Sequence, residues 1–565
     1  MNDRPWYSSY PEGVPHQLGP VQYESLADLL NECFESYSDN PAFENMGKVM
    51  TFAELKEQAD HFACYLIHDL GLSSGDKVAI QLPNLLQYPV ALFGALRAGM
   101  TVVNVNPLYT PSELKHQLVD SDAKVLVVLA NFASNLEQIF HETKLTHVLI
   151  TEIGDLVGGV KGAWVNFGVK YIKKMVPNYH LPQAKSFKAA LKKGSNHTFQ
   201  QPKISSTDLA FLQYTGGTTG VSKGAMLSHA NLISNLLQVN AWMKSGGLKA
   251  GAEIYITALP IYHIFALVAN VLGSVSLGSQ NILITNPRDM AAFVKELKKH
   301  QFTVLSGVNT LFNGLLNYPD FKDCDFSQLR FGFGGGMAVQ QAVAEKWLEV
   351  TGSPLAEGYG LTETSPVLTI NPLDGNHKLG TIGLPVPNTE IRIFDDDFNE
   401  VPQGQPGELC AKGPQVMEGY YNKPEETAKV MQEGWFKTGD IATMDEQGFF
   451  KIVDRKKEMI LVSGFNVYPN EIENIIALHP KVLEVGVIGV PDAKSTEAVK
   501  AVVVKKDDSL TEEDILTHCK EYLTPYKCPK HVSFTNELPK SNVGKILRRI
   551  IKENDLKNHQ YESAK

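Results

Sequence analysis

The stretch Tyr214-Thr-Gly-Gly-Thr-Thr-Gly-Val-Ser-Lys-Gly224 is the most informative part of this sequence, and it follows the apolar run Leu209–Leu212. Its glycines and hydroxyl residues leave backbone N–H groups and small donors available to surround polyphosphate oxygens. Lys223 would add a mobile positive charge against the outer phosphates. The spacing is not that of a Walker A loop, because no Gly-Lys-Ser/Thr stands at the required position. We therefore predict a different kind of phosphate-binding loop; a flexible loop without a ligand is the alternative.

Apolar, β-branched runs alternate with helical patterns over most of the chain. Strands that alternate with helices are typical of βαβ units, whose largely parallel sheets carry helices on their faces. The expected fold class is therefore α/β. The expected strands are 124–129, 146–150, 281–284 and 302–305, and the expected helices include 112–120 and 290–300.

The apolar stretch Ile261–Leu277 is interrupted by one histidine, one asparagine and two serines. A membrane-spanning helix needs about 20 mostly apolar residues. We therefore expect this stretch to form a buried core helix.

The character of the sequence changes at Asp454-Arg-Lys-Lys-Glu458, which is a run of charged residues after a turn-rich region. Beyond it we expect strands at 459–463 and 498–505, a helix at 510–523, and an N-capping box at Asn470–Glu473. We therefore place an N-terminal domain at 1–454, a hinge at 455–457 and a small α+β C-terminal domain at 458–565, which is a reasonable size for a domain. A charged surface loop is the alternative reading of this run.

The composition excludes some classes of protein. The 565 residues include 52 Lys+Arg and 62 Asp+Glu, which gives a net charge of −10. Such a chain is a poor general nucleic-acid binder, since neutralising phosphates needs excess basic residues. The 6 cysteines show no CxxC pair, and the N-terminus lacks the basic and then apolar run of a signal peptide. We therefore expect reduced thiols and a cytoplasmic protein.

Several further stretches, in the same order along the chain, resemble the adenylate-forming superfamily of acyl-CoA synthetases, luciferases and peptide-synthetase adenylation domains. Within it the likeness is greatest to bacterial long-chain fatty-acid–CoA ligases, and it covers nearly the whole chain. Besides Tyr214–Gly224, the matching stretches are Leu259–Ile264, Gly334–Met337, Glu357–Thr364, Trp435–Asp440 and Pro539–Lys545.

The resemblance implies a large N-terminal domain, a small mobile C-terminal domain and a two-step reaction. A fatty acid and ATP would give acyl-adenylate and pyrophosphate, and coenzyme A would then displace AMP. Two anions meet in the first step, so cations must offset their repulsion. Mg²⁺ is the implied cofactor, with Glu363 and Thr215 as ligands, because magnesium favours few protein oxygens plus substrate phosphates.

The resemblance also assigns the nucleotide site. Asp440 would accept hydrogen bonds from both ribose hydroxyls, which suits a two-oxygen acceptor, and Arg455 would lie beside the same sugar. Adenine would lie close to a glycine turn, with Tyr359 stacked on its other face. The residues expected to contact ATP or AMP are Thr215, Gly216, Gly217, Thr218, Thr219, Gly220, Lys223, Gly335, Gly336, Glu357, Gly358, Tyr359, Gly360, Thr362, Asp440 and Arg455.

The resemblance implies that Lys545 is the catalytic residue and bridges the attacking carboxylate and the α-phosphate, a role that suits the compact charge and long stem of lysine. Family knowledge adds a rotation of the C-terminal domain between the two steps, with Lys457 as the hinge. Gly464 would then leave room for the pantetheine arm of coenzyme A. His263 either lies near the acyl carbonyl or is an ordinary buried histidine.

One stretch predicts a helix with an aromatic face. A basic amphipathic helix could lie on an anionic membrane, where acyl substrates partition. The alternative is a surface helix packed on its own domain. The apolar residues are Trp164, Phe167, Tyr171, Ile172 and Met175, and the basic ones are Lys170, Lys173 and Lys174.

These observations predict an AMP-forming long-chain fatty-acid–CoA ligase, with a peripheral membrane position as a hypothesis. Its partners would be fatty acid, ATP and coenzyme A, without nucleic acid. The alternatives are a peptide-synthetase-like or luciferase-like adenylating enzyme, or a non-catalytic lipid-uptake protein with a residual nucleotide pocket. The sequence leaves open the acyl chain length and the oligomeric state, for which a homodimer is one option.

Overall fold

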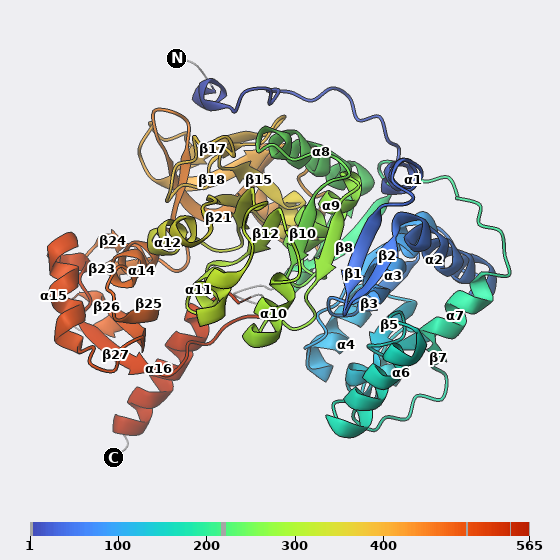
Figure 1. The fold of residues 1–565 in the computed structure, drawn as a ribbon. Coiled ribbons are helices and arrows are strands. Elements are labelled where there is room, and N and C mark those ends of the chain that lie inside the picture. The colour runs from blue at the N-terminus through green and yellow to red at the C-terminus, as the bar shows by residue number, and fades with distance from the viewer. Residues whose placement is uncertain (1–3, 216–221, 493–494, 543, 564–565) are drawn as a thin grey trace.

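The computed structural model describes residues 4–215, 222–492, 495–542 and 544–563, with side chains as far as residue 557. Three β-sheets form the N-terminal part of the chain, and a fourth sheet forms a separate body beside them (Figure 1). The N-terminal segment crosses the top of the molecule, and the last helix points away from it at the bottom left.

The central sheet has nine strands in the order β16-β15-β14-β13-β12-β10-β11-β1-β2. It is parallel from β14 to β1 and antiparallel at both edges. The strands are β1 (Pro41–Asn45), β2 (Lys48–Thr51), β10 (Ile254–Thr257), β11 (Gln280–Leu283), β12 (Val304–Gly307), β13 (Phe331–Gly334), β14 (Leu355–Gly360), β15 (Val367–Ile370) and β16 (Leu384–Pro385).

A second sheet has eight strands in the order β19-β9-β8-β4-β3-β5-β6-β7. It is parallel from β8 to β7, whereas the β8–β9 and β9–β19 pairs are antiparallel. The predicted phosphate loop joins its strands β8 and β9. The strands are β3 (Lys77–Gln81), β4 (Thr101–Asn104), β5 (Val125–Leu129), β6 (His147–Thr151), β7 (Lys185–Ser186), β8 (Leu209–Thr215), β9 (Lys223–Ser228) and β19 (Gly419–Tyr420).

Two smaller sheets follow along the chain. One contains β17 (Glu390–Phe394), β18 (Gly407–Lys412), β20 (Met431–Gln432), β21 (Trp435–Met444) and β22 (Phe450–Arg455). The other, in the C-terminal body, contains β23 (Ile460–Val462), β24 (Phe465–Val467), β25 (Val482–Asp492), β26 (Thr496–Lys505) and β27 (His531–Thr535).

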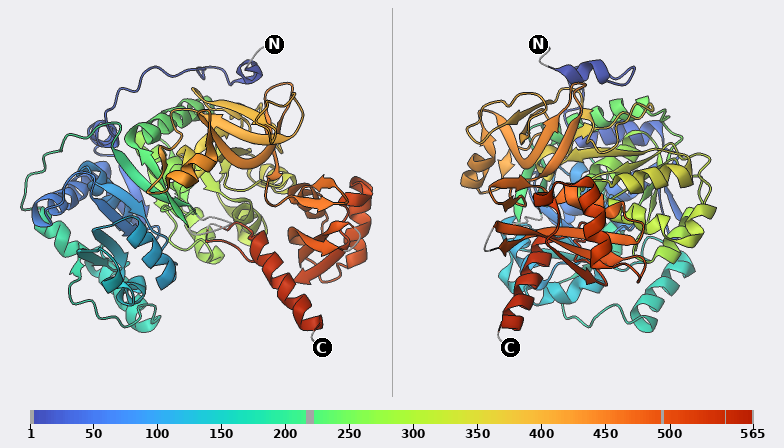
Figure 2. Two further views of the ribbon diagram at one scale, coloured as in Figure 1. Left: turned by 180° about the vertical axis from the view of Figure 1, so that it is seen from behind. Right: turned by 90° about the vertical axis from the view of Figure 1, so that its left-hand side faces the viewer.

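Helices cover the sheets, and every residue of α3 is buried. Figure 2 shows the C-terminal body standing to one side of the rest. Its two apolar clusters come entirely from residues between Ile460 and Ile551, so it has a core of its own. The helices are α1 (Leu26–Ser36), α2 (Phe52–Cys64), α3 (Gln87–Arg97), α4 (Pro111–Asp120), α5 (Ala133–Glu137), α6 (Gly159–Phe167), α7 (Phe187–Gly194), α8 (His229–Ser245), α9 (Gly273–Ser276), α10 (Met290–Leu297), α11 (Asn309–Leu316), α12 (Gln341–Thr351), α13 (Pro424–Val430), α14 (Pro469–Ala477), α15 (Glu512–Tyr522) and α16 (Arg548–Ser563).

The α/β class and the predicted elements are confirmed to within a few residues. The core helix expected within Ile261–Leu277 is present as the buried π-helical segment η6 (Ala266–Leu272) and α9, which follows it directly. Within the described residues, no helix is long and apolar enough to cross a bilayer.

The predicted capping box at Asn470–Glu473 is wrong. Helix α14 begins at Pro469, and no side chain of its own caps it. Instead, the backbone N–H of Asn470 donates to the carboxylate of Asp454 at 2.8 Å. A carboxylate at a helix N-terminus satisfies an N–H that has no partner within the helix and complements the helix dipole. The cap is therefore supplied by β22, from just before the predicted hinge.

Close packing between α2 and α7 explains Gly194. A Cβ on this residue would lie 1.8 Å from the backbone carbonyl oxygen of His61, and neither backbone can yield cheaply. We predict that Gly194→Ala lowers the free energy of unfolding by about 1–3 kcal/mol, the usual cost of overpacking. The measurement is the midpoint of thermal unfolding. Gly168→Ala is the matched control, because nothing lies within 4 Å of its Cβ position, and it should not destabilise the protein.

Candidate active site

The two described ends of the predicted phosphate loop lie side by side. Thr215 at the end of β8 pairs with Lys223 at the start of β9. The predicted phosphate-binding residues Gly216, Gly217, Thr218, Thr219 and Gly220 lie outside the described residues.

The ammonium of Lys223 already has partners. Its Nζ lies 2.9 Å from a carboxylate oxygen of Glu426 on α13 and 4.5 Å from the centre of the Tyr420 ring. Hydrogen bonds from Lys223 and Lys429 lower the pKa of Glu426 to about 2. Lys223 is therefore engaged by an acidic partner on α13 and by the ring of Tyr420.

Glu363 lies in the short helix η8 (Thr362–Thr364), which packs against β8 and β9 near Thr215. The hydroxyl of Tyr420 donates to its Oε1 at 2.6 Å. Burial raises the pKa of Glu363, although the charges of Lys223 and Arg455 oppose that rise. Within the described part of the chain this buried carboxylate forms no ion pair of its own, so it fits a site for a divalent cation.

The two residues predicted for the ribose lie opposite each other. Asp440 on β21 pairs with Arg455 on β22, and the Arg455 Nε lies 3.6 Å from the Asp440 carboxylate. The Tyr359 hydroxyl donates to the other carboxylate oxygen at 2.6 Å. Burial, and next the charge of Asp440, raise the pKa of Tyr359. Tyr359 therefore supports Asp440 through its hydroxyl in addition to presenting a ring.

The glycine turn follows β13. A Cβ on Gly335 would lie 3.1 Å from the Phe265 ring and 3.2 Å from the Gly358 carbonyl oxygen, and Gly336 has φ +76°. Beside the turn, burial raises the pKa of Glu357 to about 8, and its carboxylate accepts a backbone hydrogen bond from Val339. A buried acceptor is therefore present beside the glycine backbone.

Two other predicted nucleotide residues are glycine for reasons of packing. A Cβ on Gly358 would lie 2.7 Å from the Phe333 ring, and one on Gly360 would lie 1.8 Å from the Pro366 carbonyl oxygen. The neighbouring Thr362 is the first residue of η8. The tight contact of β14 with its surroundings therefore accounts for both glycines without a ligand.

The turn with Lys545 lies against the N-terminal part. Hydrogen bonds from the Leu547 N–H to the Pro539 carbonyl, and from the Lys545 N–H to the Ser541 hydroxyl, close the turn. Burial, and next the charge of Arg455, lower the pKa of Lys545 to about 8, while Asp440 acts in the opposite direction. The carbonyl oxygen of Gly544, which directly precedes Lys545, accepts a hydrogen bond from Thr310 on α11 at 2.9 Å, so the lysine turn contacts the N-terminal part.

His263 lies near enough to Lys545 for the lysine charge to act on its pKa. Burial, and next the charge of Lys545, lower its pKa to about 4, so the ring is neutral near pH 7. Its Nδ1 accepts a long hydrogen bond of 3.4 Å from the Phe265 N–H. His263 is therefore a neutral side chain whose pKa is affected by the charge of Lys545.

The predicted hinge residue Lys457 lies in a turn at 456–458 between β22 and β23. Gly464 is exposed at the tip of the β23–β24 hairpin, where its φ of +86° by itself favours glycine. A Cβ there would meet nothing within 4 Å. In this arrangement Lys545 is half-buried in a turn that contacts α11, whereas Gly464 is exposed.

Arg548, at the start of α16, is an important residue that sequence reasoning missed. Its guanidinium forms ion pairs with Asp454 at 3.0 Å, with Glu458 at 2.6 Å and with Glu473 at 2.6 Å. Burial raises the pKa of Asp454 and Glu473, whereas for Glu458 burial is outweighed by Arg548 and Arg455, so its pKa is lowered. The Arg548 cluster, as we call these four residues, spans both sides of the predicted hinge.

Comparisons with known proteins show the family and the fold. Residues 30–421 match the model of the AMP-binding enzyme family, and residues 471–545 match that of the AMP-binding enzyme C-terminal domain. A long-chain-fatty-acid–CoA ligase of Escherichia coli O6:H1 is 58% identical over 97% of this chain and 98% of its own. One from Yersinia pestis is 57% identical over 98% and 99%. An anthranilate CoA ligase in complex with anthranoyl-AMP has the same fold, with a TM-score of 0.84 at 24% identity, over 95% of this chain and 98% of its own.

We predict that the Arg548 cluster stabilises the C-terminal domain. Arg548→Met would leave three carboxylates together with no buried cation, which costs about 3–5 kcal/mol. The pKa values of the carboxylates would rise in the folded variant, so it would bind more protons than its unfolded chain. Its loss of stability should therefore be largest near pH 7 and smaller near pH 5. Unfolding of the C-terminal domain at the two pH values measures this.

The neighbouring residue gives a control. Arg549 is exposed and contacts only Glu553, at 3.5 Å, among the described residues. Arg549→Met should change stability by less than about 0.5 kcal/mol. Equal losses in the two variants would contradict the role given to the Arg548 cluster.

Proposed function

The chain belongs to the AMP-binding enzyme family, and on that premise we propose that it joins a long-chain fatty acid to coenzyme A with ATP. The enzyme is an AMP-forming acid–thiol ligase, as its relatives in Escherichia coli and Yersinia pestis are named. The observation that supports the proposal within this chain is the contact of the Lys545 turn with the N-terminal part, where the Thr310 hydroxyl donates to the Gly544 carbonyl oxygen at 2.9 Å. Lys545 would supply a cation there, near enough for the charges of Arg455 and Asp440 to act on its pKa.

In the first step the fatty carboxylate attacks the α-phosphorus of ATP, and the bond to pyrophosphate breaks. Lys545 would contact both anions and reduce their repulsion. Asp440 would hold the ribose, and Glu357 is an acceptor of the kind that the exocyclic amine of adenine requires. Mg²⁺, held by Glu363 and Thr215, would supply positive charge at the phosphates.

In the second step the sulfur of coenzyme A attacks the acyl carbonyl, and AMP leaves with the electron pair of the broken C–O bond. The cysteines of the chain are unsuited to this role, since burial raises the pKa of each thiol. The pKa is about 12 for Cys33, Cys410 and Cys519, about 11 for Cys324, and raised for Cys64 and Cys528.

Alternation between the steps would use the turn at Lys457. Rotation there would withdraw Lys545, whose task is complete once acyl-adenylate has formed. It would also bring the exposed hairpin with Gly464 toward the site, where the missing side chain leaves room for the pantetheine arm. The separate core of the C-terminal domain supports movement as one body.

We predict that Lys545→Ala reduces fatty-acid-dependent pyrophosphate release by about 10²- to 10³-fold, as loss of a charge-stabilising group at a reacting centre does. Thioester formation from supplied acyl-adenylate and coenzyme A should stay within a few-fold. Lys552→Ala on α16 is the control and should leave both steps unchanged. If the unmodified protein releases no pyrophosphate with oleate, ATP and Mg²⁺, the proposed function is wrong.

The hypothesis of a membrane position rests on α6 and on the π-helical segment η5 (Gly168–Ile172). The exposed fractions are 66% for Trp164, 47% for Phe167, 60% for Tyr171 and 70% for Ile172. Neighbouring aromatic rings contact one another, with centroids 5.9 and 5.2 Å apart. Soluble proteins rarely expose such a row, which is typical of an interaction surface.

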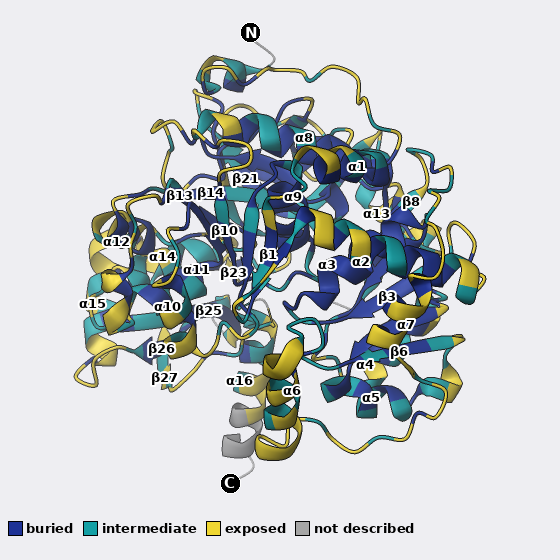
Figure 3. Cartoon of the chain, turned by 45° about the vertical axis from the view of Figure 1, so that its right-hand side comes forward, coloured by how far each residue is buried: buried dark blue, intermediate teal, exposed yellow. Residues whose placement is uncertain are grey.

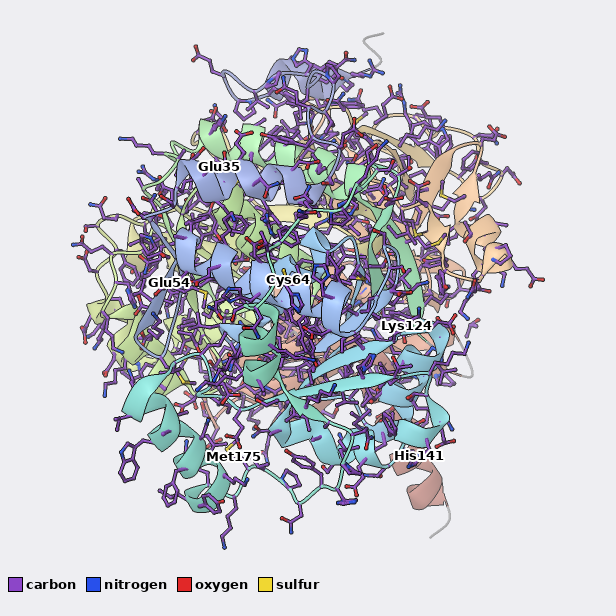
Figure 4. All side chains as sticks on the ribbon, turned by 90° about the vertical axis from the view of Figure 1, so that its right-hand side faces the viewer. Glu35, Glu54, Cys64, Lys124, His141 and Met175 are labelled. Atoms are coloured by element: carbon purple, nitrogen blue, oxygen red, sulfur yellow. The ribbon has the colours of Figure 1, made fainter. Side chains whose placement is uncertain are left out.

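The position of this aromatic row suits a flat partner. Figure 3 shows α6 with much exposed surface, and in Figure 4 Met175 lies near its end at the margin of the molecule. Lys170, Lys173 and Lys174 lie beside the row, so an anionic bilayer would be complementary in both charge and polarity. We propose that this face rests on the inner leaflet, where the acyl substrate partitions.

We predict that Trp164→Ser/Phe167→Ser weakens binding to vesicles containing phosphatidylglycerol by at least about tenfold, because two large side chains would no longer enter the lipid. Cosedimentation measures the binding, and Tyr522→Ser, which removes an equally exposed ring on α15, is the control. Unchanged binding of the double variant would contradict the membrane hypothesis.

A further inference from the structure

Helix α11 contacts the C-terminal domain through two side-chain donors. The Thr310 hydroxyl donates to the carbonyl oxygen of Gly544 at 2.9 Å, and the Asn313 amide donates to the carbonyl oxygen of Leu483 at 3.0 Å. The two donors are three residues apart, so they lie on the same face of the helix. Figure 1 shows α11 between the central sheet and the C-terminal body.

The first contact fixes the backbone beside the catalytic lysine. Gly544 directly precedes Lys545 and has φ +82°, and a Cβ on it would lie 2.9 Å from the Thr310 hydroxyl and 3.2 Å from a methyl group of Val308. The approach is close enough that a glycine is needed on one side and a short side chain on the other. Movement of this carbonyl would move Lys545 with it.

The second contact fixes the structure behind the lysine turn. Leu483 belongs to β25, against which α16 packs. The orientation of the Asn313 amide is itself set, because its oxygen accepts a hydrogen bond from Asn317 at 2.9 Å. The amide nitrogen therefore points toward Leu483.

We propose that α11 is the docking helix of the C-terminal domain, and that Thr310 and Asn313 are positioning residues for the adenylation step alone. This proposal rests on the proposed function, since it concerns how Lys545 is placed in the first step. Both acceptors are backbone carbonyls of the moving domain, so both bonds break when that domain rotates. The thioester-forming step should not depend on them.

The test is the double variant Thr310→Val/Asn313→Leu in the full chain, which keeps side-chain size and removes both donors. We expect the kcat of fatty-acid-dependent pyrophosphate release to fall by about tenfold or more, because two hydrogen bonds favour the docked state. The KM for ATP, and thioester formation from supplied acyl-adenylate, should stay within about twofold. Thr310→Ser keeps the hydroxyl and should behave as the unmodified enzyme does.

A matched control is available on the other side of the molecule. Thr143→Val removes the same kind of bond, from a hydroxyl to the Phe140 carbonyl at 2.8 Å, and should leave both steps unchanged. Hydrogen exchange in peptides containing Lys545 gives a readout without activity. Exchange should be faster in the double variant and unaltered in Thr143→Val.

The possible results distinguish failure of the docking role of α11 from failure of the proposed function. Adenylation within twofold of the unmodified enzyme, or equal losses in both steps, would overturn the docking role. Unaltered hydrogen exchange at Lys545 would overturn it as well. If the unmodified chain releases no pyrophosphate with fatty acid, the function itself is wrong, while exchange still reports whether α11 holds the lysine turn.

Discussion

The site depends on bringing an ammonium group from a separate small domain into a space that already holds charges. Burial lowers the pKa of Lys545 to about 8, and the charge of Arg455 adds to this effect, so the surroundings of the ammonium disfavour its charged form. Under the proposed function, the anions of ATP and of the fatty carboxylate would raise this pKa again. Docking of the C-terminal domain and binding of these anions would then be coupled, since each would make the other more favourable.

In the Arg548 cluster, three carboxylates compensate the buried charge of the guanidinium. One guanidinium meets Asp454 before the hinge and Glu458 after it. Asp454 also caps α14 through the Asn470 N–H. A single carboxylate on β22 therefore binds two elements of the C-terminal domain. Arg548 is the first residue of α16 and lies three positions after Lys545, so the cation of the Arg548 cluster and the proposed catalytic cation belong to one short segment.

The sequence predicted the elements whose signal is local. Val125–Leu129 is an apolar β-branched run, and the helical face with Trp164 follows from spacing alone. Contacts between residues far apart in the sequence could not be predicted, because no local pattern indicates them. The Tyr420–Glu363 bond spans 57 positions and the Arg548–Asp454 pair spans 94. The predicted cap of α14 failed for the same reason, because a carboxylate 16 positions upstream took the place of a local side chain.

Under the proposed function, the C-terminal domain must dock on α11 for the first step and detach for the second. The free energy of docking should therefore be small. Among the residues that the structure describes, two side chains of α11 donate hydrogen bonds to the C-terminal domain, and each bond is worth about 0.5–1.5 kcal/mol net. Their sum is small beside the core of either domain, yet it is enough to change the population of the docked state by roughly tenfold or more. A large apolar interface at this position would hold Lys545 in place after acyl-adenylate had formed and would slow the second step. Polar contacts to backbone carbonyls define one position of the domain and can be exchanged for water when it turns, which is what an enzyme with two successive reactions at one site requires.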